Sequence, residues 1–423
     1  MPAEASRDIA VRSTPWQPIF AISVANALEW FDFVIFGYFA AIISANFFPV
    51  GNEATSLLLA LATFGVAFLV RPLGATILGS YADRHGRKPA LLLTISLMVT
   101  GTGIIAFAPT YSSVGLFAPA LVVCGRVLQG FSAGGEFGGT TAYLVEQNPD
   151  RRGFFSSWQF AGQAFAALLA NLCGVILTNA LSAEQLASWG WRIPFLFGLL
   201  IALVAYYIRR QLDESPEFQL AERSVTPFGE LLSGALERLL IAIGFVLIAT
   251  VATYTLVFMP SFAVSQLGLP LSAAFLAGLL TSSIQMVLIP IVGALSDRWG
   301  RLPIAYIMVL AILVLAYPLF NWLISVPTLG TLLAFQVVIG LLLAGYGGVL
   351  PALMSDIFPT RIRTTGLSIS YALSVSLFGG LAPFIDASLA EIIGSKVAAV
   401  YYVMIAAVIS LSALGAARWR GYV

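Results

Sequence analysis

The stretch GSYADRHGRKP, from Gly79 to Pro89, places four charged residues and the only histidine of the chain between two long apolar segments. A second stretch, GALSDRWGRLP from Gly293 to Pro303, repeats its pattern. Glycine, aspartate, glycine and arginine recur in the same order and spacing, about half of the 423-residue chain further on. A polar turn repeated at half the chain length predicts two halves of equivalent structure.

The composition predicts a protein of the lipid bilayer. Hydrophobic residues make up 59% of the chain, charged residues 10%, and the mean hydropathy is +0.93, whereas soluble domains are about 25% charged. The net charge of +1 gives no indication of an acidic partner, and no nucleic-acid partner is expected. Cys124 and Cys173 both lie in apolar runs, so neither a disulfide framework nor a metal site is supported. No cofactor is expected.

Apolar segments long enough to cross a bilayer recur along the whole chain. The first follows a polar N-terminal stretch without a cleavage-site pattern, so we interpret it as a retained span. We expect an N-terminal six-helix half at residues 1–210, a central cytoplasmic loop at 211–237 and a C-terminal six-helix half at 238–423. The twelve predicted spans are 18–45, 54–79, 90–109, 115–146, 154–180, 193–210, 238–266, 272–294, 303–325, 329–358, 365–391 and 397–417.

The basic residues predict the orientation. With the N-terminus in the cytoplasm, most of the 21 Lys and Arg residues fall in the N-terminal tail, in the loops on the cytoplasmic side, or after the last span. The positive-inside rule therefore predicts that both termini are cytoplasmic.

The first polar loop, G-x-x-x-D-x-x-G-R-[KR], resembles the signature loop of the major facilitator superfamily, and the resemblance extends over essentially the whole chain. The second loop departs from the pattern at Leu302, where a basic residue is usual. Other motifs resemble the metabolite:proton symporters of that superfamily, and most of all its citrate and tricarballylate carriers. These motifs are NALEWFDF (26–33), RPLGATILG (71–79), GRVLQGFSAGGEFGG (125–139) and WGWRIPF (189–195).

The resemblance implies an all-α membrane protein with twelve transmembrane helices in two pseudo-symmetric six-helix halves. It implies proton-coupled import of an organic acid, citrate or a related tricarboxylate, by alternating access. It also implies that the protein is a monomer in a bacterial inner membrane. Other substrates of the group remain alternatives: dicarboxylates, 2-oxoglutarate, shikimate, and betaine or proline. Sodium remains an alternative coupling ion, and a drug or metabolite exporter is a further alternative. An enzyme is not expected, because one loop histidine supplies neither a nucleophile–base set nor metal ligands.

The repeated loops are expected to act as gates, because oppositely charged residues at helix ends can hold one face of a transporter shut. After the fourth and tenth spans, an acid is followed by basic residues in both halves. We therefore predict that Arg87 pairs with Glu146 and that Arg301 pairs with Asp356. The alternative is that these charges only fix the orientation, and His85 is expected to be solvated. The predicted gating residues are Gly79, Asp83, Gly86, Arg87, Glu146, Asp297, Gly300, Arg301 and Asp356.

Polar residues at membrane depth are the strongest functional signal, because charges there are costly. On the first span Asn26 and Glu29 share a helix face, with Asp32 beside them, and Arg126 lies at comparable depth on the fourth span. Burial favours the neutral form of a carboxyl group, so these acids are candidate proton carriers. We predict that substrate is bound by Asn26, Glu29, Arg126, Gln129, Gln159, Gln163, Tyr346, Tyr371 and Ser374, and that protons are carried by Glu29, Asp32 and Glu136.

Structural roles compete with these assignments. In the alternative for Arg126, this residue neutralises Glu29 or Glu136 as a structural pair. In the alternative for Asn171 and Gln285, these amides join helices to one another. The glycines of GFSAGGEFGG are expected to permit close helix packing. Two further residues have simple interpretations: Arg71 reaches the cytoplasmic interface, and Asp386 is solvated at the outer end of the eleventh span.

Overall fold

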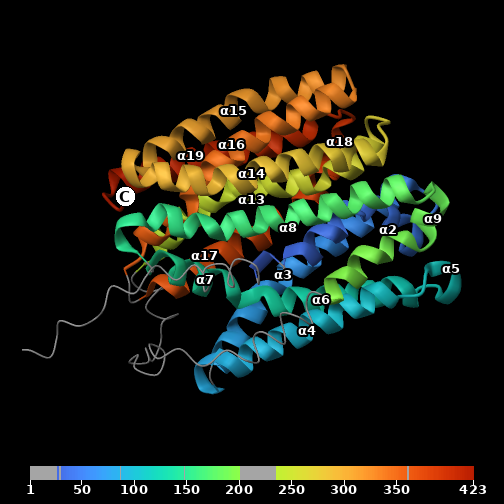
Figure 1. The fold of residues 1–423 in the computed structure, drawn as a ribbon, viewed down its shortest axis with the longest axis horizontal. Helices are drawn as coiled ribbons and strands as arrows, with labels where there is room; N and C mark the ends of the chain where they lie inside the picture. Colours follow the sequence, from blue (N-terminus) through green and yellow to red (C-terminus); the bar gives the residue numbers. More distant parts are fainter. Residues whose placement is uncertain (1–25, 28–29, 86, 147, 201–234, 360–361) are drawn as a thin grey trace, which may run out of the picture.

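The computed structural model describes residues 26–27, 30–85, 87–146, 148–200, 235–359 and 362–423. Within these ranges every regular element is a helix, and the long helices run side by side along one direction (Figure 1). Nine of the described helices are long and apolar enough to cross a membrane. A tenth span results if Trp30–Tyr38 and α2 (Ala40–Phe47), which meet at 69°, are counted together.

Two shorter apolar helices, Leu92–Phe107 and Gly190–Leu200, lie at the third and sixth predicted spans. Each predicted span within the described residues therefore coincides with a helix. The N-terminal helices after α2 are α3 (Glu53–His85), α4 (Arg87–Phe107), α5 (Tyr111–Val114), α6 (Phe117–Ser132), η1 (Ala133–Gly135), α7 (Glu136–Glu146), η2 (Pro149–Arg151), α8 (Arg152–Ala180), α9 (Ala183–Ser188) and η3 (Gly190–Arg192).

Three predicted spans are interrupted. The first bends after Tyr38, and the fourth passes through the 3₁₀ turn η1 between α6 and α7. The eleventh contains a π-helix, η5, a feature that occurs preferentially at functional sites. The C-terminal helices are α13 (Leu236–Ser265), α14 (Leu271–Trp299), α15 (Arg301–Ser325), α16 (Leu329–Ile357), α17 (Arg363–Ser374), η5 (Val375–Gly379), α18 (Ala382–Ile393) and α19 (Ala398–Trp419).

Burial separates central from peripheral helices among the C-terminal ones. In α13 and α16, 78% of the most apolar window is buried, against 28% in α15. Since all three are strongly apolar, α15 directs its apolar side chains outward, as expected of a helix in contact with lipid. The division into domains at 211–237 stays a prediction, because most of that segment lies outside the described residues.

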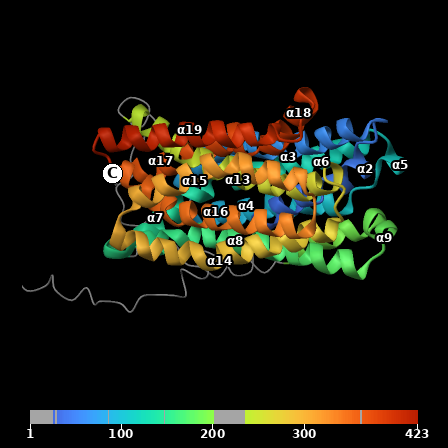
Figure 2. The same ribbon diagram turned by 90° about the horizontal axis from the view of Figure 1, so that it is seen from above.

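Close contacts join the N-terminal and C-terminal helices. The longest contact is between α8 and α14, which lie side by side in both views (Figures 1 and 2). Small residues permit it: a Cβ on Gly153 would lie 2.5 Å from the carbonyl oxygen of Gly293. A second contact joins α3 to η5, where the Ser376 hydroxyl donates to the Phe68 carbonyl at 2.6 Å.

Glycine also determines the packing of α6 on α3. A Cβ on Gly130 would lie 1.8 Å from the Ala67 carbonyl oxygen, so only glycine allows this approach. This confirms the expectation for the glycine-rich motif. In the second polar loop, Gly300 has φ +86° and lets α15 begin two residues after α14 ends.

One end of the bundle carries the connection between α14 and α15, the start of α8, and the C-terminus (Figure 1). We call it the basic end, because arginines gather there. Those in described segments include Arg151, Arg152, Arg298, Arg301, Arg418 and Arg420.

Candidate functional site

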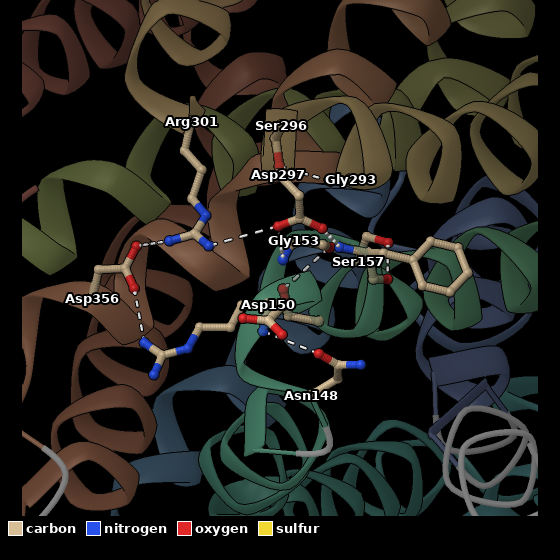
Figure 3. Close-up of polar contacts among 12 residues, drawn as sticks. Asn148, Asp150, Gly153, Ser157, Gly293, Ser296, Asp297, Arg301 and Asp356 are labelled. Atoms are coloured by element: carbon tan, nitrogen blue, oxygen red, sulfur yellow. Dashed lines mark hydrogen bonds and ion pairs between the residues drawn. The ribbon is translucent and has the colours of Figure 1, made fainter. Parts of the chain in front are cut away.

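A cluster of charges at the basic end joins the two groups of helices (Figure 3). Asp297, in the last turns of α14, accepts hydrogen bonds from the backbone N–H groups of Gly153 at 2.7 Å and Phe154 at 3.0 Å. Both N–H groups lie in the first turn of α8, where backbone donors have no acceptor within their own helix and the helix dipole also favours a negative charge. Asp297 thus caps a helix of the other group.

Asp356, near the end of α16, is paired with two arginines. The guanidinium of Arg301 contacts it directly, which confirms the pairing predicted from the sequence repeat. Arg152, from the N-terminal helices, lies 3.5 Å from it, and Arg301 also lies 3.7 Å from Asp297. Four charged residues therefore form one interface at the basic end. The sequence analysis did not assign Arg152 to it.

The equivalent pair of the N-terminal repeat cannot be compared with it. The side chains of Asp83, Arg87 and Glu146, and residue Gly86, lie outside the described residues, as does Glu29. The side chain of Glu136, on α7, also lies outside them. These assignments stay predictions.

A hydrogen-bonded chain connects a buried acid with a buried arginine inside the N-terminal helices. Asp32, 2% exposed, accepts a short hydrogen bond from the Thr102 hydroxyl. That hydroxyl accepts one from the Gln129 amide at 2.9 Å, and the Gln129 carbonyl oxygen accepts one from Arg126 at 2.9 Å. Only this orientation of the Gln129 amide satisfies both neighbours. The charge of Asp32 and that of Arg126 are thereby linked through two neutral side chains.

Arg126 is fully enclosed. Besides Gln129 it donates to the Phe64 carbonyl at 3.2 Å, and its guanidinium carbon lies 4.7 Å from the ring centroid of Phe36 and 5.0 Å from that of Phe33. It lines neither of the two pockets described below. Arg126 therefore finds its two hydrogen-bond acceptors within the protein.

Arg71 does not reach the end of the bundle, contrary to the simple interpretation of its position. Its side chain is 5% exposed, and its guanidinium carbon lies 4.4 Å from the ring centroid of Phe68, 4.5 Å from Phe33 and 5.4 Å from Trp30. The aromatic rings attract the cation and hold it inside the bundle. The interpretation failed because hydropathy does not show which side chains surround a charge.

Arg71 lines a small pocket. The pocket lies between the N-terminal and C-terminal helices, and we call it the Arg71 pocket. Its polar lining includes three further residues, two of which, Asn26 and Tyr371, were predicted to bind substrate. Its lining residues include Asn26, Trp30, Arg71, Phe137, Ser368 and Tyr371.

A second pocket, the central pocket, contains about 890 Å³ of empty space between the two groups of helices. It is lined by apolar side chains with a few amides and hydroxyls, and of the predicted binding residues it includes Gln163. The polar groups that sequence analysis did not assign to substrate binding include Tyr38, Thr281, Ser282 and Gln336.

Two stacked aromatic rings line the Arg71 pocket. Phe137 of α7 and Tyr371 of α17 stack with their centroids 3.5 Å apart and planes at 3°. The amide of Gln163, which lines the central pocket, donates to the Tyr371 hydroxyl at 3.5 Å. Because the two rings come from different groups of helices, this stack joins them on the side of the central pocket nearer the basic end.

Other predicted binding residues are engaged inside the helix packing. The Tyr346 hydroxyl donates to the Phe245 carbonyl at 2.7 Å, and Ser374 donates to the Ile243 carbonyl at 3.4 Å. Asn26 donates to the backbone carbonyl of Gln159 at 3.1 Å. Of the possible helix-joining amides, Asn171 donates to Tyr38 at 3.1 Å, while Gln285 lines the central pocket.

Asp386 is buried, contrary to the expectation from the sequence. It is 0% exposed rather than solvated, and one carboxyl oxygen accepts a hydrogen bond from Thr255 at 2.7 Å. The other oxygen has no hydrogen-bond partner among the described residues. The expectation failed because a residue near a helix end is still covered when neighbouring helices extend past it, as α13 does here.

Solved structures of similar fold place the arrangement in a class. The D-xylose-proton symporter has a TM-score of 0.74 at 18% identity, covering 94% of this chain and 97% of that chain. The xylose transporter of Escherichia coli in a partially occluded inward open conformation has a TM-score of 0.72 at 16% identity, covering 95% and 96%. The chain therefore has the same fold as these structures, twelve helices in two halves.

Sequence comparison assigns the family. The chain belongs to the sugar (and other) transporter family, which it matches over residues 19–226 and 219–415. It is 38% identical to the citrate-proton symporter of Klebsiella pneumoniae, over 93% of this chain and 90% of that relative. It is 34% identical to the proline/betaine transporter of Escherichia coli K12, over 93% and 81%, and 33% identical to the alpha-ketoglutarate permease of that strain, over 93% and 91%. It is thus related to transporters, not to enzymes, in agreement with the expectation.

Proposed function

We propose that the protein imports an organic acid, citrate or a related tricarboxylate, together with protons by alternating access. The observation that carries this proposal is the chain of hydrogen bonds from Asp32 through Thr102 and Gln129 to Arg126. When a buried carboxyl in such a chain gains or loses a proton, the hydrogen bonds along the chain change with it. The citrate-proton symporter of Klebsiella pneumoniae, named above, supports the same substrate class.

The proton acts in this scheme through the strength of each hydrogen bond. With Asp32 ionised, Thr102 donates to it and is free to accept from Gln129. Once protonated, Asp32 loses its negative charge, so the hydrogen bond that it accepts from Thr102 is no longer charge-assisted and weakens. The Thr102 hydroxyl is then held less firmly, and so is the Gln129 amide that donates to it. The proton on Asp32 therefore sets how firmly Arg126 is held.

The central pocket is the proposed substrate site. Its amides and hydroxyls come from both halves, among them Gln163, Thr281 and Gln336, and such groups donate to carboxylate oxygens without adding charge. Access then alternates as the halves rock about this pocket. Of the predicted binding residues, Gln163 lines the central pocket, and Asn26 and Tyr371 line the neighbouring Arg71 pocket.

We further propose that the basic end faces the cytoplasm of a bacterium, with both termini on that side, and that the transporter acts as a monomer in the inner membrane. The arginines of the basic end support this orientation through the positive-inside rule. The ion cluster of Asp297, Arg301, Asp356 and Arg152 then closes the cytoplasmic side.

A zwitterion such as betaine is the second candidate substrate. Trp30 and Tyr38 both line the central pocket, and aromatic faces bind quaternary ammonium groups through cation–π attraction. The relationship to a proline/betaine transporter favours the same candidate.

Uptake into vesicles that contain the purified protein decides between these candidates. Labelled citrate, tricarballylate, 2-oxoglutarate and betaine are offered with an imposed pH gradient, with a sodium gradient, or with neither. Citrate or tricarballylate is expected to accumulate under the pH gradient alone, and a protonophore is expected to abolish this. Accumulation of betaine but of no acid would favour the second candidate, and dependence on sodium alone would replace the proton as coupling ion.

A further inference from the structure

The Arg71 guanidinium lacks the partners that a buried cation normally has. Among the described residues it donates no hydrogen bond and forms no ion pair, and its Nε is enclosed without an acceptor. Three aromatic rings attract the charge, yet they satisfy none of its five N–H donors in the way an oxygen does. A buried guanidinium that has no protein acceptor and lines a pocket indicates a ligand that supplies oxygen acceptors.

Arg126 provides an internal comparison. Its side chain is enclosed by some of the same rings, including Phe33, but it donates to Gln129 and to the Phe64 carbonyl. Arg126 lines neither the Arg71 pocket nor the central pocket. The Nε of each arginine is enclosed without an acceptor. The two differ at their terminal nitrogens, because those of Arg126 have protein acceptors and Arg71 has none among the described residues.

The rest of the Arg71 pocket indicates a carboxylate. Asn26, Ser368 and Tyr371 contribute an amide and two hydroxyls, while Trp30 and Phe137 form apolar walls. A planar guanidinium matches the two oxygens of a carboxylate. The pocket is small beside the central pocket, so it is proposed to receive one carboxylate group and not a whole organic acid.

The Arg71 pocket lies next to the central pocket. Trp30 lines both pockets, and Phe137 and Tyr371 stack beside the Arg71 pocket with Gln163 of the central pocket bonded to the tyrosine. The helix Trp30–Tyr38 leads into α2, which lies at the end of the bundle opposite to the basic end (Figure 1). The central-pocket residues Val34 and Tyr38 follow Asn26 along the chain in that direction. The Arg71 pocket therefore lies on the basic-end side of the central pocket.

We propose that the Arg71 pocket is an exit subsite, which binds one carboxylate of the transported acid when Phe137 and Tyr371 separate. The inference rests on the proposed function for the substrate class and for the orientation. When the two rings part, the pockets join, and Arg71 becomes the cation nearest to a substrate that leaves the central pocket. The acid then has a binding partner on its way to the cytoplasmic side.

The first test is ligand binding, which does not depend on transport. Melting temperatures of the detergent-purified protein are measured with citrate, tricarballylate, succinate and, as ionic-strength control, sodium chloride. The carboxylates are expected to raise the melting temperature of the wild type more than that of Arg71→Gln, which retains only the central pocket. Arg298→Gln removes an exposed arginine at the basic end and is expected to behave like the wild type. Equal shifts in wild type and Arg71→Gln, or no shift in the wild type with any carboxylate, would overturn the subsite.

The second test is sidedness. In vesicles, exchange of labelled citrate is measured with the unlabelled acid varied on one side at a time, and a cysteine at an exposed basic-end position reports the orientation. Arg71→Gln is expected to raise the half-saturation concentration about 10-fold or more at the cytoplasmic face, the loss of one charge-assisted contact, and to change it little at the other face. Arg71→Lys retains the charge and is expected to fall between. An unchanged cytoplasmic value in folded Arg71→Gln would contradict the inference. Failure of the proposed function is recognised separately, since the wild type would then show no pH-driven uptake of any acid.

Discussion

Asp297 caps the first turn of α8 through the backbone N–H of Gly153, at 2.7 Å, although the two residues belong to different halves of the transporter. The carboxylate thus meets a helix N-terminus that must lose this partner whenever the basic end opens. Because the repeated loop supplies the aspartate, its sequence motif closes one face of the transporter by capping a helix of the other half.

Replacing Asp297 by asparagine is expected to weaken this closure by about 1–2 kcal/mol, because the amide keeps one acceptor oxygen but loses the charge that the helix terminus favours. Spin labels at Arg151→Cys and Arg298→Cys, in a background with Cys124→Ser and Cys173→Ser, report the separation of the halves. The asparagine variant should show a larger fraction of long distances. Asp150→Asn, an exposed acid in the same region, serves as control, and identical distance distributions in both variants would contradict the capping role.

Replacing Asp32 by asparagine is expected to separate exchange from accumulation. The amide resembles a permanently protonated acid, so the variant should still exchange labelled substrate across the membrane but fail to concentrate it under a pH gradient. Counterflow and pH-driven accumulation are measured in parallel, with Glu29→Gln and Glu136→Gln as the other predicted proton carriers. If all three variants accumulate substrate as the wild type does, these acids do not carry the proton, and sodium coupling becomes the better account.

Arg126→Lys is expected to abolish uptake while the protein stays folded and inserted. A lysine has no planar fork, so it cannot hold the Gln129 oxygen and the Phe64 carbonyl together as the guanidinium does. Uptake and ligand-induced thermal stabilisation are both measured. Loss of both fits the prediction that Arg126 binds the substrate. Loss of uptake with undiminished stabilisation by citrate would instead assign Arg126 to the coupling chain of Asp32 alone.

The positions of the spans could be predicted from the sequence, and so could the pairing of Arg301 with Asp356, because hydropathy and repetition are linear properties of the chain. The rotation of each helix about its axis could not. In a membrane the lipid-facing and core-facing sides are equally apolar, so hydropathy does not show that Arg71 turns toward Phe68 or that Asp386 turns toward Thr255. The π-helix at Val375–Gly379 was not predicted either, and its contact with the other half, where Ser376 donates to the Phe68 carbonyl, is equally invisible to hydropathy.

The burial of Asp386 leads to a stability prediction. Asp386→Asn keeps an acceptor for the Thr255 hydroxyl and removes a carboxyl that has no cation within ion-pair distance among the described residues. The variant should therefore melt at or above the temperature of the wild type. Asp386→Leu leaves the Thr255 hydroxyl without this acceptor and should cost about 1–3 kcal/mol. Thermal unfolding in detergent compares them, with Thr255→Val as partner in a double-mutant cycle. A stable leucine variant would mean that the hydrogen bond contributes little.

The stack of Phe137 on Tyr371 is predicted to separate the central pocket from the cytoplasmic side. Phe137→Ala removes one of the two rings, so the pockets should join even while the ion cluster at the basic end is closed. We expect this variant to exchange substrate faster but to accumulate several-fold less of it, because a path that stays open dissipates the gradient. Tyr371→Phe retains the stacked ring and loses the contact with Gln163, which at 3.5 Å is a weak hydrogen bond, so it should accumulate nearly as the wild type. Counterflow and accumulation of labelled citrate are measured for both variants in vesicles of matched protein content. If Phe137→Ala accumulates substrate normally while Tyr371→Phe does not, the hydroxyl and not the stacked ring performs the closure.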